Sequence, residues 1–321
     1  MLALRDLVKY LRVLRLRASV EPITEDYRGW SWYREPVKPP SYRNISLSDF
    51  AYLYCQTMRN VYLKYVLKVE QRITKPLLEG TILHESVYAA IEDVRRLLYD
   101  GASPDELLSL LSHACERVNN IIEKVVSLRN ASLTERDRDD IHHKALSIYK
   151  HLVLYYAGEI KRVETDVVDY RPDTLLGQVI PHFVQFQADG YLIGLSRKLI
   201  VDAVMPGVIL EMKFGNMVSL DLVKTALAGY ALAIESDYEI PIDFGLAVKI
   251  SFTRLCRGNG KIEFLPRVVV TPVYLSDEVR YRFLSLRDEA YDIIETQRDP
   301  DIARSCPEYC PYYHICRGGA T

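Results

Sequence analysis

Two carboxylates and a lysine occupy neighbouring β-rich segments of the chain. Asp202 lies in segment 198–204, Glu211 and Lys213 lie in segment 208–214, and a Pro-Gly pair separates the two segments. Side chains alternate between the two faces of a strand, so Glu211 and Lys213 share one face. A tight turn at the Pro-Gly pair folds the first segment back and brings Asp202 beside Glu211. We therefore expect the three charged groups to converge on one face of a sheet.

Such a cluster suits metal-dependent hydrolysis. Charged groups on an apolar sheet are costly unless they are paired or hold a metal ion. Two carboxylates suit hard divalent cations such as Mg²⁺ and Mn²⁺, which prefer oxygen ligands and keep several waters. An ion of this kind polarises a phosphodiester and activates a water, while a lysine orients that water or balances negative charge. A solvated Glu–Lys pair on a surface hairpin would give the same pattern, so the motif alone leaves both interpretations open.

A histidine and a tyrosine on two expected helices are candidates for the same site. His84 follows Gly80, where we expect a helix to start, and lies in its first turn at the edge of an apolar stripe. An imidazole that projects from there toward the carboxylates would complete a metal site. Tyr230 lies on the inward face of a helix expected over residues 219–235 and could reach the same place. Both residues could equally belong to the hydrophobic core.

The cysteines indicate a second metal site. The chain has six, and three of them lie in a short tail punctuated by prolines: Cys306, Cys310 and Cys316. Three thiolates need a fourth ligand to complete a tetrahedral or cluster site. Cys115 is expected to be a small core residue of an amphipathic helix, and Cys256 lies in a charged hairpin tip, so we expect Cys55 to be the fourth ligand. Spacing alone favours zinc and an iron–sulfur cluster equally.

The remaining sequence supplies the elements that must position these groups. Five β-rich segments with one inserted helix predict an α/β core: 183–193, 198–204, 208–214, 245–252 and 262–271. We divide the chain into four zones, namely a basic helix and Pro-rich connector (1–45), a helical region (46–160), the α/β core (161–275) and a C-terminal helix with the cysteine tail (276–321). The prolines at 33–40 predict an extended connector.

Composition and charge indicate which partners and which cellular location to expect. The chain has 321 residues and a net charge of −2, which by itself does not indicate a nucleic-acid partner. A local groove can nevertheless supply phosphate contacts in a protein that is neutral overall. No segment resembles a signal peptide or is apolar enough to span a bilayer, so we expect a soluble, cytoplasmic protein without a membrane partner.

Taken in order along the chain, these motifs resemble those of a known family. An early cysteine, a histidine helix, an aspartate, a Glu-x-Lys motif, a helical tyrosine and a cysteine tail follow one another: Cys55, Gly80-x-x-x-His84, Asp202, Glu211-x-Lys213, Tyr230, Cys306, Cys310 and Cys316. The ordered set resembles the RecB-like nucleases of the CRISPR-associated Cas-four family, over residues 46–316. The chain is long for that family and has an additional N-terminal helix. In this it is similar to the longer archaeal branch, often called Csa-one.

The resemblance implies a restriction-endonuclease-like core of the PD-(D/E)XK, RecB type. It implies metal ligands for Mg²⁺ or Mn²⁺, which are His84, Asp202, Glu211 and the carbonyl of Met212. It implies a catalytic set made of Lys213, Glu211, Asp202 and Tyr230. It also implies an iron–sulfur cluster, 4Fe–4S or alternatively 2Fe–2S, that is bound by four thiolates: Cys55, Cys306, Cys310 and Cys316.

The activity implied by the resemblance is exonuclease action on single-stranded DNA ends. The DNA would be trimmed for capture as new CRISPR spacers, a step of antiviral defence, with other CRISPR adaptation proteins as candidate partners. Two positions depart from the family pattern. Ala226 stands where relatives usually have a glutamine, and the tail begins with Cys-x-x-x-Cys where many members have two intervening residues. The alternatives are a non-catalytic DNA-binding or assembly subunit of the spacer-acquisition complex, and a zinc-stapled protein of unrelated function.

Overall fold

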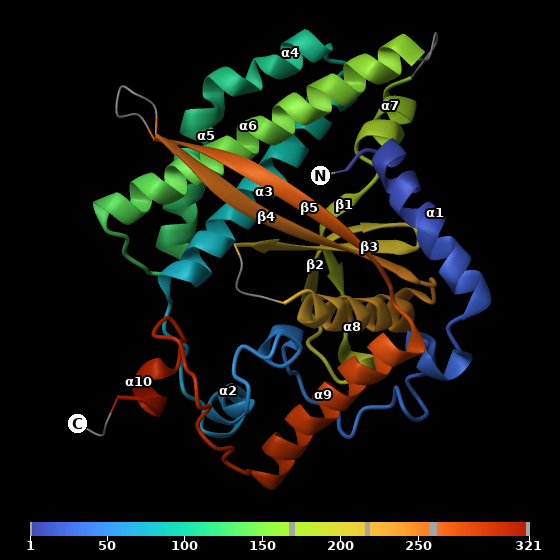
Figure 1. The fold of residues 1–321 in the computed structure, drawn as a ribbon, viewed down its shortest axis with the longest axis vertical. Coiled ribbons are helices and arrows are strands. Elements are labelled where there is room, and N and C mark those ends of the chain that lie inside the picture. Colours follow the sequence, from blue (N-terminus) through green and yellow to red (C-terminus); the bar gives the residue numbers. More distant parts are fainter. Residues whose placement is uncertain (1, 167–170, 216–218, 257–261, 319–321) are drawn as a thin grey trace.

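The fold is organised by a mixed β-sheet, which we describe from a computed structural model (Figure 1). The structure describes residues 2–166, 171–215, 219–256 and 262–318. In this part of the chain the sheet has five strands in sequence order: β1 (Phe183–Ala188), β2 (Leu199–Met205), β3 (Val208–Phe214), β4 (Phe244–Cys256) and β5 (Ile262–Tyr274). Neighbouring strands are antiparallel except β3 and β4, which are parallel and joined by the crossover helix α8 (Leu220–Tyr238). The predicted α/β class is confirmed.

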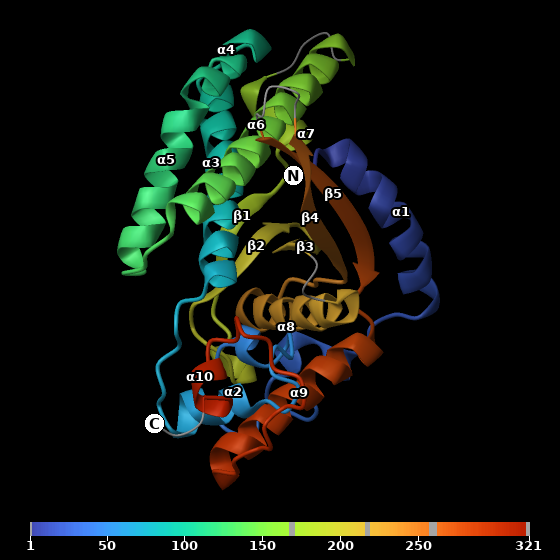
Figure 2. The same cartoon turned by 60° about the vertical axis from the view of Figure 1, so that its left-hand side comes forward.

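Helices cover both faces of the sheet (Figures 1 and 2). One face packs against a helical layer: α1 (Leu4–Val20), α3 (Lys75–Tyr99), α5 (Leu110–Leu128), α6 (Glu135–Asp166) and α7 (Pro172–Val179). The other face packs against α8, α9 (Asp277–Thr296) and the N-terminal connector. The described part also includes short α-helices, α2 (Arg59–Val61), α4 (Pro104–Leu108) and α10 (Tyr313–Cys316), and several 3₁₀ or π turns. Among the described residues no helix is long and apolar enough to cross a membrane.

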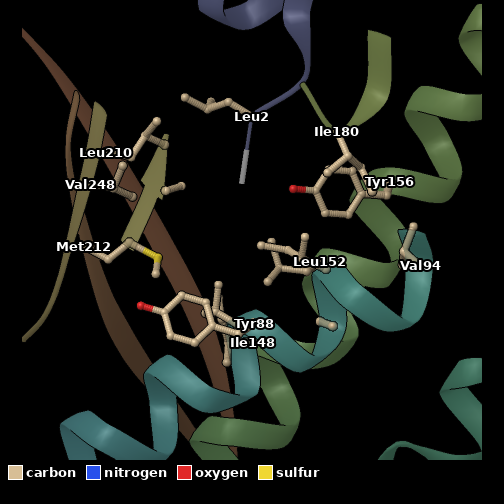
Figure 3. Close-up of a cluster of buried hydrophobic side chains, with 14 of the residues drawn as sticks. Leu2, Tyr88, Val94, Ile148, Leu152, Tyr156, Ile180, Leu210, Met212 and Val248 are labelled. Atoms are coloured by element: carbon tan, nitrogen blue, oxygen red, sulfur yellow. The ribbon is translucent and has the colours of Figure 1, made fainter. Parts of the chain in front are cut away.

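The core between the sheet and the helical layer fixes α3 over the strands β2 and β3. Figure 3 shows Leu210 and Met212 of β3 facing Tyr88 of α3 and Ile148 of α6, and all four are buried. Burial of an apolar side chain of this size stabilises the fold by about 1.5–3 kcal/mol. The packing of α3 therefore sets where its polar residues meet the sheet.

A buried ionic cluster holds the opposite layer together. Arg280 of α9 is fully buried, and its guanidinium lies 2.6 Å from the carboxylate of Glu235 on α8. Glu235 also accepts hydrogen bonds from Arg28 at 2.9 Å and from the backbone N–H of Gly29 at 2.8 Å. The connector, α8 and α9 thus meet at one carboxylate.

Some expected boundaries are wrong. Residues 33–40 form turns where an extended segment was expected, because the buried guanidinium of Arg287 draws in the carbonyl oxygens of Pro36, Val37 and Lys38. The helix expected to start after Gly80 begins at Lys75, so His84 lies well inside the helix and not in its first turn. The first strand ends at Ala188, and a 3₁₀ turn occupies Tyr191–Ile193.

Candidate active site

The β2–β3 hairpin places the two acids side by side. Ala203 pairs with Leu210, so the preceding Asp202 and the following Glu211 are neighbours on adjacent strands. The turn is tight because Gly207 takes a left-handed φ of 75°, which a glycine accepts without strain, directly after Pro206. Asp202 and Glu211 are 8% and 3% exposed. Both carboxylates are therefore withdrawn from solvent, and the solvated surface pair is ruled out.

Helix α3 brings an imidazole to the first of these acids. Nδ1 of His84 lies 3.3 Å from Oδ1 of Asp202. The hydroxyl of Tyr88, one helical turn later, donates to the same oxygen and lies 3.3 Å from Nδ1 of His84. The backbone N–H of Met212 donates to the other oxygen, Oδ2, at 2.6 Å. Asp202 is thus fixed from both the helix and the neighbouring strand.

Two donors hold the second acid. Nζ of Lys213 lies 2.7 Å from Oε1 of Glu211, and the hydroxyl of Tyr52 donates to the same oxygen. The ammonium of Lys213 also lies 4.0 Å from the ring centroid of Tyr52, a distance typical of a cation–π interaction. The lysine is therefore fixed beside the carboxylates.

The pKa values of the two acids are shifted in opposite directions. Burial favours the neutral form of Asp202, but His84 and the other donors outweigh it, and the pKa of Asp202 is lowered. Burial, followed by the negative charge of Asp202, raises the pKa of Glu211 in spite of Lys213. Burial by itself lowers the pKa of the Lys213 ammonium. The negative charge of Glu211 outweighs burial, so the pKa is raised. Two close carboxylates with one compensating ammonium form a donor set that suits a divalent cation.

The carboxylates of Asp202 and Glu211 accept hydrogen bonds from other side chains of the protein. Among the described residues no three His, Cys, Asp and Glu side chains are arranged closely enough to hold a metal ion as they stand. The reason at this site is geometric, because Oε1 of Glu211 is directed at Lys213 and Tyr52, and Oδ1 of Asp202 is directed at Tyr88. The chemistry of the set, two carboxylates and an imidazole, nevertheless fits Mg²⁺ or Mn²⁺.

Tyr230 and Ala226 both lie on α8, but only Tyr230 borders the acidic pair. Tyr230 is 8% exposed, and its pKa is raised by burial and then by Glu211 and Asp202, so it borders the acidic pair. Ala226, one turn earlier on the same helix, is fully buried in the core between α8 and the sheet. A longer polar side chain at position 226 would therefore have to displace core residues.

Four cysteines lie in the region of α2 and α10, which are side by side in Figures 1 and 2, although their thiols are not arranged closely enough to hold a metal ion as they stand. Burial raises the pKa of the Cys306 thiol to about 11, and three other thiols add to the effect: Cys310, Cys316 and Cys55. Arg59 of α2 donates to Sγ of Cys316 at 3.4 Å and to Asp299 at 2.7 Å. Four thiols are the number that an iron–sulfur cluster or a tetrahedral zinc site takes, so the donor set fits either.

The other two cysteines are exposed. Cys115 lies on α5 with its sulfur 3.6 Å from Nε2 of His142, so the expectation that it is a core residue is wrong. Cys256 is the last residue of β4.

A family comparison complements this geometry. The sequence profile of a family described as "CRISPR-associated exonuclease Csa1" matches residues 1–319. The chain belongs to the Csa1 family. A relative of that description from Thermoproteus tenax is 36% identical over 317 residues, which cover 99% of this chain and 100% of the relative. A second from Saccharolobus solfataricus is 34% identical over 307 residues, 94% of this chain and 95% of the relative.

A solved structure from Eubacterium rectale, of a protein provisionally described as an exonuclease, is also similar to this Csa1-family chain. It is 13% identical, covers 87% of this chain and 88% of its own, and has a TM-score of 0.39.

The hydrogen bonds of Tyr88 and Tyr52 to the two acids, and the packing of Tyr54 on Tyr52, were not predicted from the sequence of this Csa1-family chain. Tyr88 lies four residues after His84 on one helix, a spacing that places both on the same face and that sequence reasoning could have used. Tyr52 and Tyr54 lie in an irregular segment without periodicity, and only their closeness to Cys55 pointed to them. Their positions depend on long-range contacts.

The segment that carries these last two tyrosines joins the acidic site to the cysteines. Tyr52 hydrogen-bonds Glu211 at one end, and Cys55 joins the other thiols three residues later. Leu53 and Met58 have left-handed φ values of 44° and 52°, which residues with a Cβ adopt only where surrounding contacts impose them. The backbone from 52 to 58 is therefore held from both sides.

Proposed function

We propose that the chain is a Mg²⁺- or Mn²⁺-dependent deoxyribonuclease, an exonuclease that trims single-stranded DNA ends during CRISPR adaptation. The observation that carries the proposal is the convergence of His84, Asp202, Glu211 and Lys213 in one buried polar site. Two relatives of full length, described as CRISPR-associated exonucleases, support the same reaction and setting. Candidate partners are DNA ends and other proteins of spacer acquisition.

Each side chain has a proposed part. His84, Asp202, Glu211 and the carbonyl of Met212 would hold the ion, which when bound polarises the scissile phosphate and lowers the pKa of its water. Lys213 keeps its charge in the buried site, so it can orient the attacking water or balance the negative charge on phosphorus. Tyr88 and Tyr52 donate to the two acids and fix their orientation, and Tyr230 borders the pair.

We also propose that the sheet and α8 form a RecB-type, restriction-endonuclease-like core and that the four cysteines bind an iron–sulfur cluster. The mixed sheet with both acids on its central strands supports the first proposal. The closeness of Cys55 to the tail thiols, enough to act on the pKa of Cys306, supports the second. The cluster, 4Fe–4S or 2Fe–2S, would be structural, since it joins residues far apart in the chain and so stabilises the fold.

Replacement of Lys213 by alanine tests the nuclease proposal. Cutting of a 5′-labelled single-stranded oligonucleotide with Mn²⁺ or Mg²⁺ should fall at least about 100-fold, as expected for loss of a group that stabilises developing charge. Lys161 on α6, whose side chain is 73% exposed, provides the matched control, and Lys161→Ala should cut like the wild type. Wild-type cutting by Lys213→Ala would reject the site.

The second candidate is a non-catalytic DNA-binding or assembly subunit of the spacer-acquisition complex. Ala226 favours it, because this position cannot present a polar group to substrate from inside the core. Binding of Mn²⁺ and DNA by the wild type without any cutting would support this candidate over the nuclease.

A further inference from the structure

One exposed aromatic ring stands beside the acidic site. Tyr54 is 54% exposed, and its ring centroid lies 5.5 Å from that of Tyr52, whose hydroxyl donates to Glu211. The ring of Tyr52, on which Tyr54 packs, also lies under the ammonium of Lys213, at 4.0 Å. Tyr54 is thus exposed to solvent and packs on a residue that bonds the acidic site.

The placement of this ring is imposed by its surroundings. Tyr54 lies between Tyr52, which is buried, and Cys55, which joins the other thiols. It follows Leu53, whose left-handed φ of 44° is rare for a residue with a Cβ. Single exposed aromatic residues are ordinary on protein surfaces. An exposed ring that a strained segment holds against Tyr52, the hydrogen-bond partner of Glu211, is a different case, because strained segments cluster at binding sites.

We propose that Tyr54 is a base-stacking residue, whose exposed face receives an unpaired nucleobase of the strand that enters the acidic site. The proposal rests on the proposed nuclease function, because it places a phosphate of the same strand next to Glu211 and Lys213. Every nucleobase has a flat π-face, so stacking on tyrosine binds DNA without requiring a particular sequence.

This subsite would select single strands. In a duplex both faces of an internal base are covered by its neighbours, whereas the bases of a single strand are free to stack on a side chain. Tyr54 would then be a specificity-determining residue, and Lys213 would bind the adjoining phosphate. The ring of Tyr54 lies 5.5 Å from that of Tyr52, over which the ammonium of Lys213 lies at 4.0 Å, so one short stretch of the strand can make both contacts.

The test compares two fluorescein-labelled strands of equal length, oligothymidylate and the same backbone with abasic sites. Their binding to the full-length protein is measured by fluorescence anisotropy in EDTA, where metal-dependent cutting cannot occur. The wild type should bind oligothymidylate about fivefold or more tightly than the abasic strand. Tyr54→Ala should lose that preference, and Tyr54→Trp should keep it. Tyr99, which is 71% exposed at the end of α3, provides the control, and Tyr99→Ala should bind like the wild type.

Each outcome decides the proposal. A preference for bases that survives in Tyr54→Ala would overturn it, as would a wild type that binds both strands equally or binds neither. Cutting is then measured separately with Mn²⁺. A wild type that shows the Tyr54-dependent preference but does not cut refutes the nuclease function and leaves the stacking subsite standing. A wild type that cuts but shows no Tyr54-dependent preference refutes the stacking subsite and leaves the nuclease function standing.

Discussion

The Nδ1 atom of His84 lies 3.3 Å from Oδ1 of Asp202, across the boundary between α3 and the sheet. The contact joins a helix of one layer to the strand pair that carries Glu211 and Lys213. Apolar packing of α3 on β3 makes the contact possible, since Tyr88 and Met212 belong to the same buried cluster. The core therefore brings His84 to the two acids, which the β2–β3 hairpin places side by side.

Tyr52→Phe tests whether the tyrosines orient the acids. The change removes the hydroxyl that donates to Glu211 but keeps the ring on which Lys213 rests. Loss of such an orienting partner should lower the affinity for Mn²⁺, or the rate of cutting, by about 10- to 100-fold. Unchanged Mn²⁺ titrations and cutting rates would show that Tyr52 has a packing role alone.

Iron content tests the cysteine cluster. Protein purified without oxygen should be brown and contain iron and labile sulfide, and Cys306→Ala should lose the colour and most of the iron, because each thiolate is a ligand. Cys115→Ala, which removes an exposed thiol on α5, should keep both. Absorption spectra and elemental analysis measure the outcome. A colourless wild type with stoichiometric zinc would contradict the iron–sulfur proposal.

Glu235→Gln tests the buried ionic cluster. Burial favours the neutral acid, but Arg280 and the backbone donors outweigh it and lower the pKa of Glu235. A carboxylate with a lowered folded-state pKa stabilises the fold above its ordinary value of 4.5, and this contribution is lost as the pH falls below that value. At pH 7 the change should lower the free energy of unfolding by about 3 kcal/mol, because it breaks a buried pair.

The difference between the wild type and Glu235→Gln should shrink at acidic pH. Chemical unfolding followed by circular dichroism at pH 7 and pH 4 measures it. Glu295→Gln, at an exposed position of α9, is the control and should match the wild type at both values. A difference that grows as the pH falls would contradict the sign of the pKa shift.

The positions of the strands, the β2–β3 hairpin and the crossover helix could be predicted from the sequence because they depend on local patterns. Alternation of apolar residues and the Pro-Gly turn placed β3 over Val208–Phe214 and brought Asp202 to Glu211. The C-terminal helix expected within residues 276–321 is also confirmed as α9. Both follow from neighbours in the chain.

Contacts between distant segments could not be predicted in this way. The connector forms turns because the buried guanidinium of Arg287, on α9, binds the carbonyl oxygens of the connector. The sequence of residues 33–40 contains no pattern that would predict this contact. Tyr52 reaches Glu211 through an irregular segment whose backbone includes two left-handed residues. Cys115 was expected in the core because its helix is amphipathic, yet it lies on the exposed side.

The central claim is that His84, Asp202 and Glu211 form one site for a divalent ion. Calorimetric titration with Mn²⁺ tests it most directly, on the wild type, Glu211→Ala, His84→Ala and Lys213→Ala. We predict one ion per chain at this site, affinity at least about tenfold weaker in Glu211→Ala and His84→Ala, and retained binding in Lys213→Ala, which removes only a competing cation. Equal Mn²⁺ affinity in the wild type and Glu211→Ala would contradict the account.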